Sequence, residues 1–196
     1  MLQQFAVRQI AKRAFVDAVE ILSLIAVLEA GNSNGSSEAL NKAGAGRAAG
    51  HIQRALFTRL HVIVARHYLP VRSNSDLHAA RAFELLKNKD VRAGVTSPER
   101  EARLAQAETD WAKCCADDRL DAYLHLRHKF LAHLAEPKEG VPIPMYGEVL
   151  EIARNTASCL NHLANGTGIV AMEIDTQIPA QRDSAKAFWA PWADEK

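Results

Sequence analysis

The sequence predicts an all-α fold, an antiparallel bundle of five or more helices that contains no sheet. Apolar residues recur at intervals of three and four in every long apolar segment, which is the period of an amphipathic helix. No segment shows the strict alternation of apolar and polar residues that is typical of a half-buried strand. Alanine is frequent and aromatic residues make up only 6% of the chain, a composition that suits closely packed helices.

Length, charge and cysteine content narrow the class of protein. A chain of 196 residues is long enough for one well-buried domain or two small ones. A formal net charge of +1 gives the whole protein no attraction to nucleic acid, so any such binding must come from a local patch. The cysteines are odd in number and lack metal-ligand spacing: Cys114, Cys115 and Cys159. We therefore expect no disulfide scaffold, no metal site and no cofactor, and a reducing, cytoplasmic location.

The first half of the chain predicts two long helices, over residues 2–28 and 45–68. The apolar run within the first helix falls well short of the roughly 20 residues that cross a bilayer, so no membrane segment is expected. Gly31-Asn32-Ser33 begins a polar, glycine-rich stretch, which predicts a flexible loop near residues 31–44.

The second of these helices has two distinct faces. Ile52, Leu56, Leu60 and Ile63 line the predicted core face, and His67 on that face is expected to be a core histidine with a hydrogen-bond partner. On the opposite side the helical spacing groups four basic or titratable residues: Arg47, His51, Arg54 and His61. These four form either a solvated basic face or a stripe that follows a phosphate backbone.

The second half of the chain predicts further helices separated by breaks. Ser75 or Asp76 can cap a helix that reaches about Asn88, and a break containing Gly94 follows. Ser97 can cap the next helix, which extends through Cys115. After the helix that carries Arg127 and a proline-rich turn, a last amphipathic helix ends at Asn165-Gly166. We expect residues 1–175 to form a single domain, and the apolar tail 176–196 to dock on its own chain or on a partner.

Arg127 and His133 are the candidate functional residues of the helix before the proline-rich turn. On a helical wheel, Arg127 falls in the middle of the apolar face, within roughly 60° of Leu120, Leu124, Leu131 and Leu134. A guanidinium there needs a carboxylate, a second chain or an anionic ligand, because an unpaired buried charge is costly. His133 lies near the predicted end of the helix, about 120° from Arg127 on the wheel. Arg127 is therefore either paired with a structural carboxylate or part of a functional pair.

The segment LRHKFLAHL, at residues 126–134, resembles the Arg/His motif of the HEPN superfamily, whose name stands for higher eukaryotes and prokaryotes nucleotide-binding. Arg127, His128 and His133 match that motif. The following EPKEGVPIPMYGEVLEIARN, at 136–155, resembles the abortive-infection U-type branch, in which a proline-rich turn and another helix follow the motif helix. SDLHAARAFELLK, at 75–87, is similar to an upstream helix of that branch.

This resemblance implies a metal-independent endoribonuclease, such as a toxin or phage-defence protein. In HEPN ribonucleases two protomers dimerise and bring both Arg/His pairs into one cleft. The catalytic residues would be Arg127 and His133, with His128 and Lys129 as additional RNA contacts, and the partners would be a second copy, RNA and an antitoxin protein. Ala135 stands where some HEPN toxins carry a tyrosine that a partner transferase modifies, so that route of regulation is not implied.

A second function stays open from the sequence. Some HEPN domains do not cleave RNA, and the chain could be a non-catalytic helical module that dimerises and binds RNA, a nucleotide or a protein partner. His128 and Lys129 could equally belong to a solvated helix face. His125 and His128 lie about one helical turn apart, but no third ligand accompanies them, so we do not expect a metal there.

Overall fold

The computed structural model describes residues 1–126, 142–171 and 173–192, and the described chain contains nine α-helices and no strand. The predicted all-α class is therefore confirmed. The helices are α1 (Leu2–Gly31), α2 (Asn34–Lys42), α3 (Gly46–Arg66), α4 (Ala79–Leu86), α5 (Lys89–Ala93), α6 (Glu101–Cys115), α7 (Leu120–Leu126), α8 (Tyr146–Gly166) and α9 (Ile178–Trp189). Two short 3-10 turns, Ile174–Gln177 and Ala190–Trp192, flank α9.

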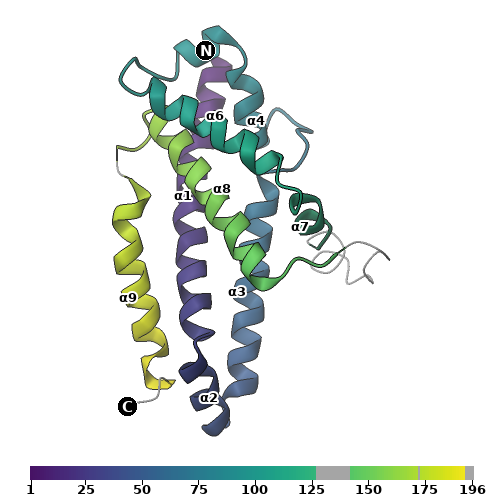
Figure 1. Cartoon of the computed structure of the whole chain (residues 1–196). Coiled ribbons are helices and arrows are strands. Elements are labelled where there is room, and N and C mark those ends of the chain that lie inside the picture. Colours follow the sequence, from purple (N-terminus) through teal and green to yellow (C-terminus); the bar gives the residue numbers. More distant parts are fainter. Residues whose placement is uncertain (127–141, 172, 193–196) are drawn as a thin grey trace.

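Helix α1 is the central helix of the bundle and contacts α3, α4, α8 and α9 (Figure 1). Figure 1 shows α3 and α8 antiparallel to α1, α9 running in the same direction as α1, and α6 packed near the N-terminal end of the bundle. The buried face of α1 follows the helical period of the sequence and includes Val7, Ile10, Ala14, Ala18, Ile21 and Ile25. Small alanines on this face allow the neighbouring helices to approach closely.

The predicted loop near residues 31–44 is wrong, because Asn34–Lys42 forms helix α2. Leu40 of α2 is buried in a small cluster with Ala49 of α3 and Trp189 of α9. This packing outweighs the weak helix preference of the Asn, Gly and Ser residues. Gly31 is required at this corner, since a Cβ atom there would lie 2.6 Å from the Trp189 ring.

The segment after residue 176, predicted as a docked tail, contains helix α9, which lies along α1 (Figure 1). Ala185 and Trp189 are its buried residues. The Trp189 indole Nε1 donates a hydrogen bond of 2.9 Å to the carbonyl oxygen of Val27. This bond satisfies the polar atom of an otherwise apolar anchor.

Two predicted boundaries in the middle of the chain differ from the structure. Neither Ser75 nor Asp76 caps α4, whose N-cap is His78. The Asp76 carboxylate instead accepts hydrogen bonds from the backbone amides of Arg72 and Ser73, 2.7 and 2.9 Å long, and so closes the preceding turn. The predicted break after Asn88 contains the short helix α5, because the Asn88 side chain accepts two backbone amides and acts as its cap.

A buried ion-pair network joins α1 to the end of α3. The carboxylate of Asp17 has no exposed surface and forms ion pairs with Arg66 and, at 3.0 Å, with Arg13. His67, predicted to be a core histidine, is also fully buried, and its Nε2 lies 3.1 Å from Asp17 Oδ2. The His67 Nδ1 accepts the backbone amide of Ala79, so the proton of the neutral ring is on Nε2 and is donated to Asp17.

The network fixes the charge state of both residues. Burial would raise the pKa of Asp17, but the hydrogen bond from His67 and the positive charge of Arg66 outweigh it, and the pKa lies below its ordinary value. Burial lowers the pKa of His67, against the opposing attraction of Asp17. The folded protein therefore holds an ionised Asp17 beside a neutral His67.

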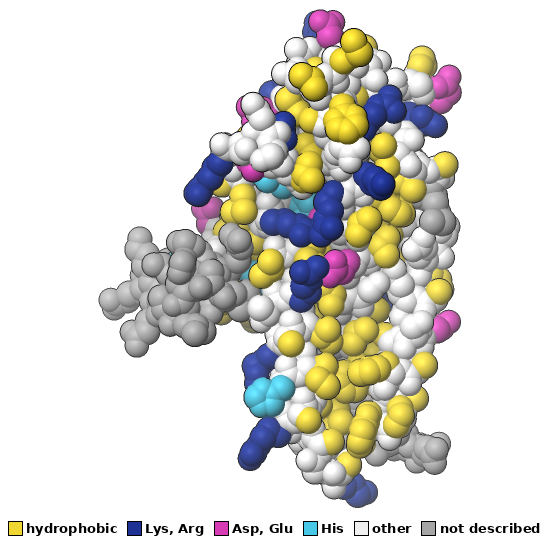
Figure 2. All heavy atoms as spheres, turned by 180° about the vertical axis from the view of Figure 1, so that it is seen from behind, with side chains coloured by type: hydrophobic (Ala, Val, Ile, Leu, Met, Phe, Trp, Pro, Cys, Tyr) yellow, Lys and Arg dark blue, Asp and Glu magenta, His cyan; other side chains and the backbone are white. Residues whose placement is uncertain are grey.

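The surface of the bundle is mixed. Figure 2 shows Lys and Arg side chains over the upper part of one face and along its lower left edge, where a His side chain lies beside them, and an extended area of hydrophobic side chains over the lower half. Within the described ranges, no helix has both the length and the apolarity that a membrane crossing demands.

We predict that the unfolding free energy falls as the pH drops below about 6.5, the ordinary pKa of histidine. The folded pKa of His67 is lowered, so in this range the unfolded chain takes up a proton that the folded chain does not. Stability is therefore present above the unfolded pKa and is lost as the pH falls through the folded pKa. Urea unfolding between neutral and mildly acidic pH measures the slope, at most about 1.4 kcal/mol per pH unit for one proton.

The matched variants are His67→Gln, which removes the buried titrating ring, and His51→Gln at an exposed site of α3. The slope should shrink in His67→Gln and should stay as in the wild type in His51→Gln. An equal slope in all three proteins would contradict the assignment to His67.

Candidate functional site

All four motif residues, Arg127, His128, Lys129 and His133, lie outside the described residues. The structure does describe both flanks of the motif segment: α7 ends directly before it, and α8 begins shortly after it (Figure 1). The geometry of these flanks fixes the two described points of the chain that the segment connects. The predicted roles of the four residues stay predictions.

Arg119 fixes the start of α7. Its guanidinium binds Asp117 through two nitrogen–oxygen contacts of 2.9 and 2.7 Å, and its Nη1 donates to Glu151 of α8 at 2.7 Å. The bound carboxylates hold the pKa of Arg119 above its ordinary value, and the guanidinium lowers the pKa of Asp117. These contacts tie the loop before α7 to the first half of α8.

Tyr123 anchors the middle of α7 on α3. Its side chain is fully buried, and its ring stacks on the His61 ring with centroids 3.8 Å apart and planes 10° apart. The His61 Nε2 donates a hydrogen bond of 2.9 Å to the backbone carbonyl oxygen of Tyr123. Burial raises the pKa of Tyr123 well above its ordinary value, so its hydroxyl stays protonated and does not act as a base.

His61 therefore does not belong to the basic face that the sequence predicted. The helical wheel groups His61 with Arg47, His51 and Arg54, but His61 is fully buried because α7 packs over the second half of α3. Arg47, His51 and Arg54 are exposed. The predicted basic face is thus limited to the first half of α3.

Two further rings extend the stack to the start of α8. Phe57, one turn before His61, lies 5.8 Å from the His61 ring in a tilted arrangement. Tyr146, the first residue of α8, stacks on Phe57 with centroids 5.7 Å apart and planes 19° apart. We call these four residues, Tyr123, His61, Phe57 and Tyr146, the aromatic ladder. The ladder connects both flanks of the motif segment to one stretch of α3.

A hydrogen bond also defines the start of α8. The backbone amide of Met145 donates to Glu148 Oε2 at 2.7 Å, which satisfies a donor that a helix end otherwise leaves free. The acid in the first turn also complements the helix dipole. The chain that returns from the motif segment thus enters α8 at a defined residue.

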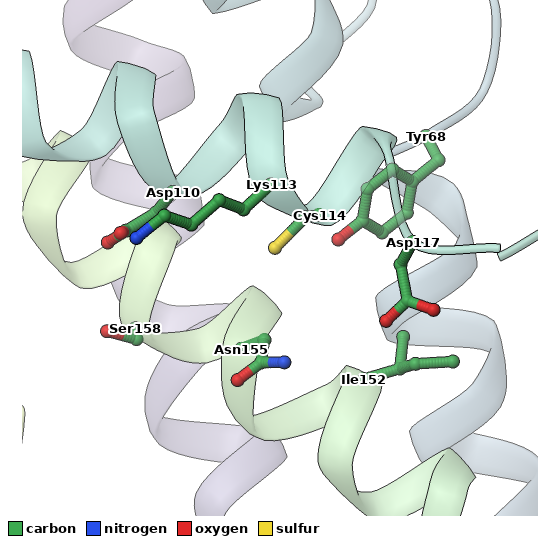
Figure 3. Close-up of a pocket in the computed structure, with 8 residues that line it drawn as sticks. All are labelled: Tyr68, Asp110, Lys113, Cys114, Asp117, Ile152, Asn155 and Ser158. Atoms are coloured by element: carbon green, nitrogen blue, oxygen red, sulfur yellow. The ribbon is translucent and has the colours of Figure 1, made fainter. Parts of the chain in front are cut away.

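A polar pocket of about 230 Å³ lies between α6 and α8, away from the ladder (Figure 3). Figure 3 shows Asp110, Lys113 and Cys114 of α6 facing Asn155 and Ser158 of α8. Sequence reasoning did not identify this group, because its residues come from two helices and form no motif.

The chemistry of this pocket does not favour catalysis. Burial raises the pKa of the Cys114 thiol. Burial also raises the pKa of the neighbouring Tyr68 hydroxyl, which forms a hydrogen bond of 2.7 Å with the Thr156 hydroxyl. A thiol without thiolate character is a poor nucleophile. The Asp110 carboxylate forms a hydrogen bond of 2.7 Å with His162 Nδ1. In the part of the chain that the structure describes, no group of three or more His, Cys, Asp or Glu side chains is arranged to hold a metal ion.

We predict that His61→Phe lowers the unfolding free energy by about 1–3 kcal/mol, the typical cost of leaving a buried polar group without a partner. The phenylalanine ring can keep the stack on Tyr123 but cannot donate to its carbonyl oxygen. His51→Phe, at an exposed position of the same helix, should change stability by less than about 0.5 kcal/mol. Chemical denaturation of the wild type and both variants measures these changes. An equal loss of unfolding free energy in both variants would show that the buried hydrogen bond of His61 does not stabilise the fold.

The comparisons with known proteins give one result. The model of the HEPN family described as AbiU2 matches residues 6–188, which includes most of α1, the whole of α2 to α8, most of α9 and the motif segment. No curated protein and no solved structure matches the chain.

Proposed function

Because the chain belongs to the AbiU2 family of HEPN proteins, we propose that it is a metal-independent endoribonuclease that uses Arg127 and His133 of each protomer. Membership of this family connects it with HEPN-type function in abortive infection. The family match across the motif carries the proposal. The aromatic ladder supports it, since it ties both flanks of the motif segment to one helix.

The proposed reaction uses the nucleophile that RNA carries itself. The 2′-hydroxyl oxygen attacks the adjacent phosphorus while a base removes its proton, and the bond from phosphorus to the 5′-oxygen breaks as an acid protonates that oxygen. The products are a 2′,3′-cyclic phosphate and a 5′-hydroxyl. Histidine suits both proton transfers because its ordinary pKa lies near neutrality.

Arg127 supplies the charge that this reaction needs. A guanidinium can bind two phosphoryl oxygens at once and stabilise the negative charge that develops in the transition state. His128 and Lys129 add contacts to phosphates on either side. No divalent metal is required for any of these roles.

A homodimer completes the proposed site. One His133 can act as the base and the His133 of a second copy as the acid, so both pairs must reach one cleft. The described surface offers a candidate contact in an apolar groove of about 710 Å³ between α1, α3 and α9. Ile52 and Phe188 in this groove are 43% and 55% exposed. Such exposure suits a self-complementary interface across a two-fold axis.

We predict that the purified protein cleaves single-stranded RNA in the presence of a chelator, and that His133→Ala lowers the rate by about 10²- to 10⁴-fold, the usual contribution of general acid–base catalysis. Arg127→Ala should also lose activity. Lys129→Ala should mainly weaken RNA binding and reduce its salt dependence. Cleavage rates on a labelled RNA check all three.

The matched control is Arg59→Gln, an arginine of α3 that Glu20 neutralises through a contact of 2.7 Å. This variant should cleave like the wild type. Activity that survives His133→Ala, or that depends on added divalent metal, would contradict the proposal. RNA binding without cleavage would instead favour the non-catalytic module.

We predict a dimer mass in light scattering at tens of micromolar, roughly the range in which weak interfaces persist. Ile52→Glu, which places a charge in the apolar groove, should shift the protein towards the monomer. A monomer mass for the wild type would contradict the dimer, whereas an unchanged dimer in Ile52→Glu would place the interface elsewhere.

A further inference from the structure

A second pocket lies at the Tyr146 end of the aromatic ladder. It has a volume of about 260 Å³ and is formed by the end of α1, the first half of α3 and the start of α8. Its lining residues are Leu28, Asn32, Gly50, Gln53, Arg54, Phe57 and Tyr146. The pocket therefore shares Phe57 and Tyr146 with the ladder, and Tyr146 follows the last undescribed residue of the motif segment by only a few positions.

Tyr146 gives the pocket an aromatic surface. One face of its ring is supported by Phe57, and the residue is 37% exposed. A ring that is held in place on one side and accessible on another is suited to stacking on a nucleobase, since every base presents a π-face. Tyr146 thus differs from Tyr123, at the other end of the ladder, which is fully buried.

Arg54 gives the pocket an available positive charge. Its guanidinium contacts the Nδ1 atom of His51 at 3.0 Å and, like Arg47, forms no ion pair with a carboxylate in the described chain. In the second half of the same helix, Arg59 is bound by Glu20 and Arg66 by Asp17. The arginines in the first half of α3 can therefore bind an external anion, whereas those in the second half are neutralised by carboxylates.

We propose that this pocket binds one nucleotide of single-stranded RNA, with the base stacked on Tyr146 and a phosphate on Arg54. An accessible ring and a guanidinium that no carboxylate of the described chain neutralises line the same pocket, which matches the alternation of base and phosphate in a single strand. In a duplex the bases are already stacked on one another and are not free to reach the ring. The identity of the ligand as RNA rests on the proposed function. The pocket would then hold the strand at the start of α8, the helix that follows the motif segment.

The binding of a short fluorescent oligoadenylate tests this assignment, measured by anisotropy in a His133→Ala background that prevents cleavage. Tyr146→Leu keeps an apolar contact with Phe57 but removes the ring, and Arg54→Gln removes the charge. Each should weaken binding roughly tenfold or more, as is typical for loss of a stacking or phosphate contact. Tyr146→Trp should restore binding. Arg54→Gln should lower the salt slope by about one, and Tyr146→Leu should leave it unchanged.

Two matched controls separate the pocket from general surface effects. Arg59→Gln removes a neutralised arginine of the same helix, and Phe5→Leu removes a 62% exposed ring on α1. Both should bind like the parent protein. Thermal unfolding of each variant shows whether it is folded, and Arg54→Gln, at an exposed position, keeps the test valid if Tyr146→Leu is unstable.

The inference is overturned if folded Tyr146→Leu and Arg54→Gln bind as tightly as the parent, or if Arg59→Gln weakens binding as much as Arg54→Gln. Its failure is distinguishable from failure of the proposed function. A wild-type protein that binds RNA through Tyr146 and Arg54 but does not cleave it would remove only the catalytic proposal. Cleavage that needs His133 but is independent of both pocket residues would remove only the pocket.

Discussion

The burial of His61 between Phe57 and Tyr123 is the contact on which the candidate site depends. The ring stacks on Tyr123, and its Nε2 donates to the Tyr123 backbone, so a single side chain of α3 fixes both the position and the direction of α7. Phe57 continues the stack to Tyr146 at the start of α8. The residues on either side of the motif segment are therefore both held against α3.

The position of α3 depends in turn on the buried network around Asp17. Arg66 and His67, at the end of α3, both contact this carboxylate of α1, and His67 also accepts the amide of Ala79 at the start of α4. A buried charge that loses its partners is strongly destabilising, so the network favours one register of α3 against α1. The same helix thus has a neutralised half that packs in the bundle and a half with available arginines that faces solvent. In the function that we propose, the first half of α3 binds RNA and the second half stabilises the bundle.

The sequence was sufficient for the fold class, for the long helices and for a core role of His67, because these depend on helical period and on apolar composition. It was insufficient for α2, where the burial of Leu40 against Trp189 determines the structure of a polar, glycine-rich segment. It also misplaced His61, since the wheel of an isolated helix cannot show that α7 covers one end of it. The aromatic ladder and the pocket at Tyr146 combine residues from three helices and have no local signal. Arg127 and His133, in contrast, come from a motif that the family match includes, although their geometry lies outside the described residues.

In the function that we propose, the helical bundle presents Arg127 and His133 to an RNA strand that supplies its own nucleophile. The most direct test is the chemistry of the RNA ends formed by the purified protein in a chelator, determined by mass spectrometry. The account predicts 2′,3′-cyclic phosphates and 5′-hydroxyls, because the 2′-oxygen is the attacking group. Products with 3′-hydroxyls and 5′-phosphates would contradict it, since they require attack by water, which in nucleases is typically activated by a metal.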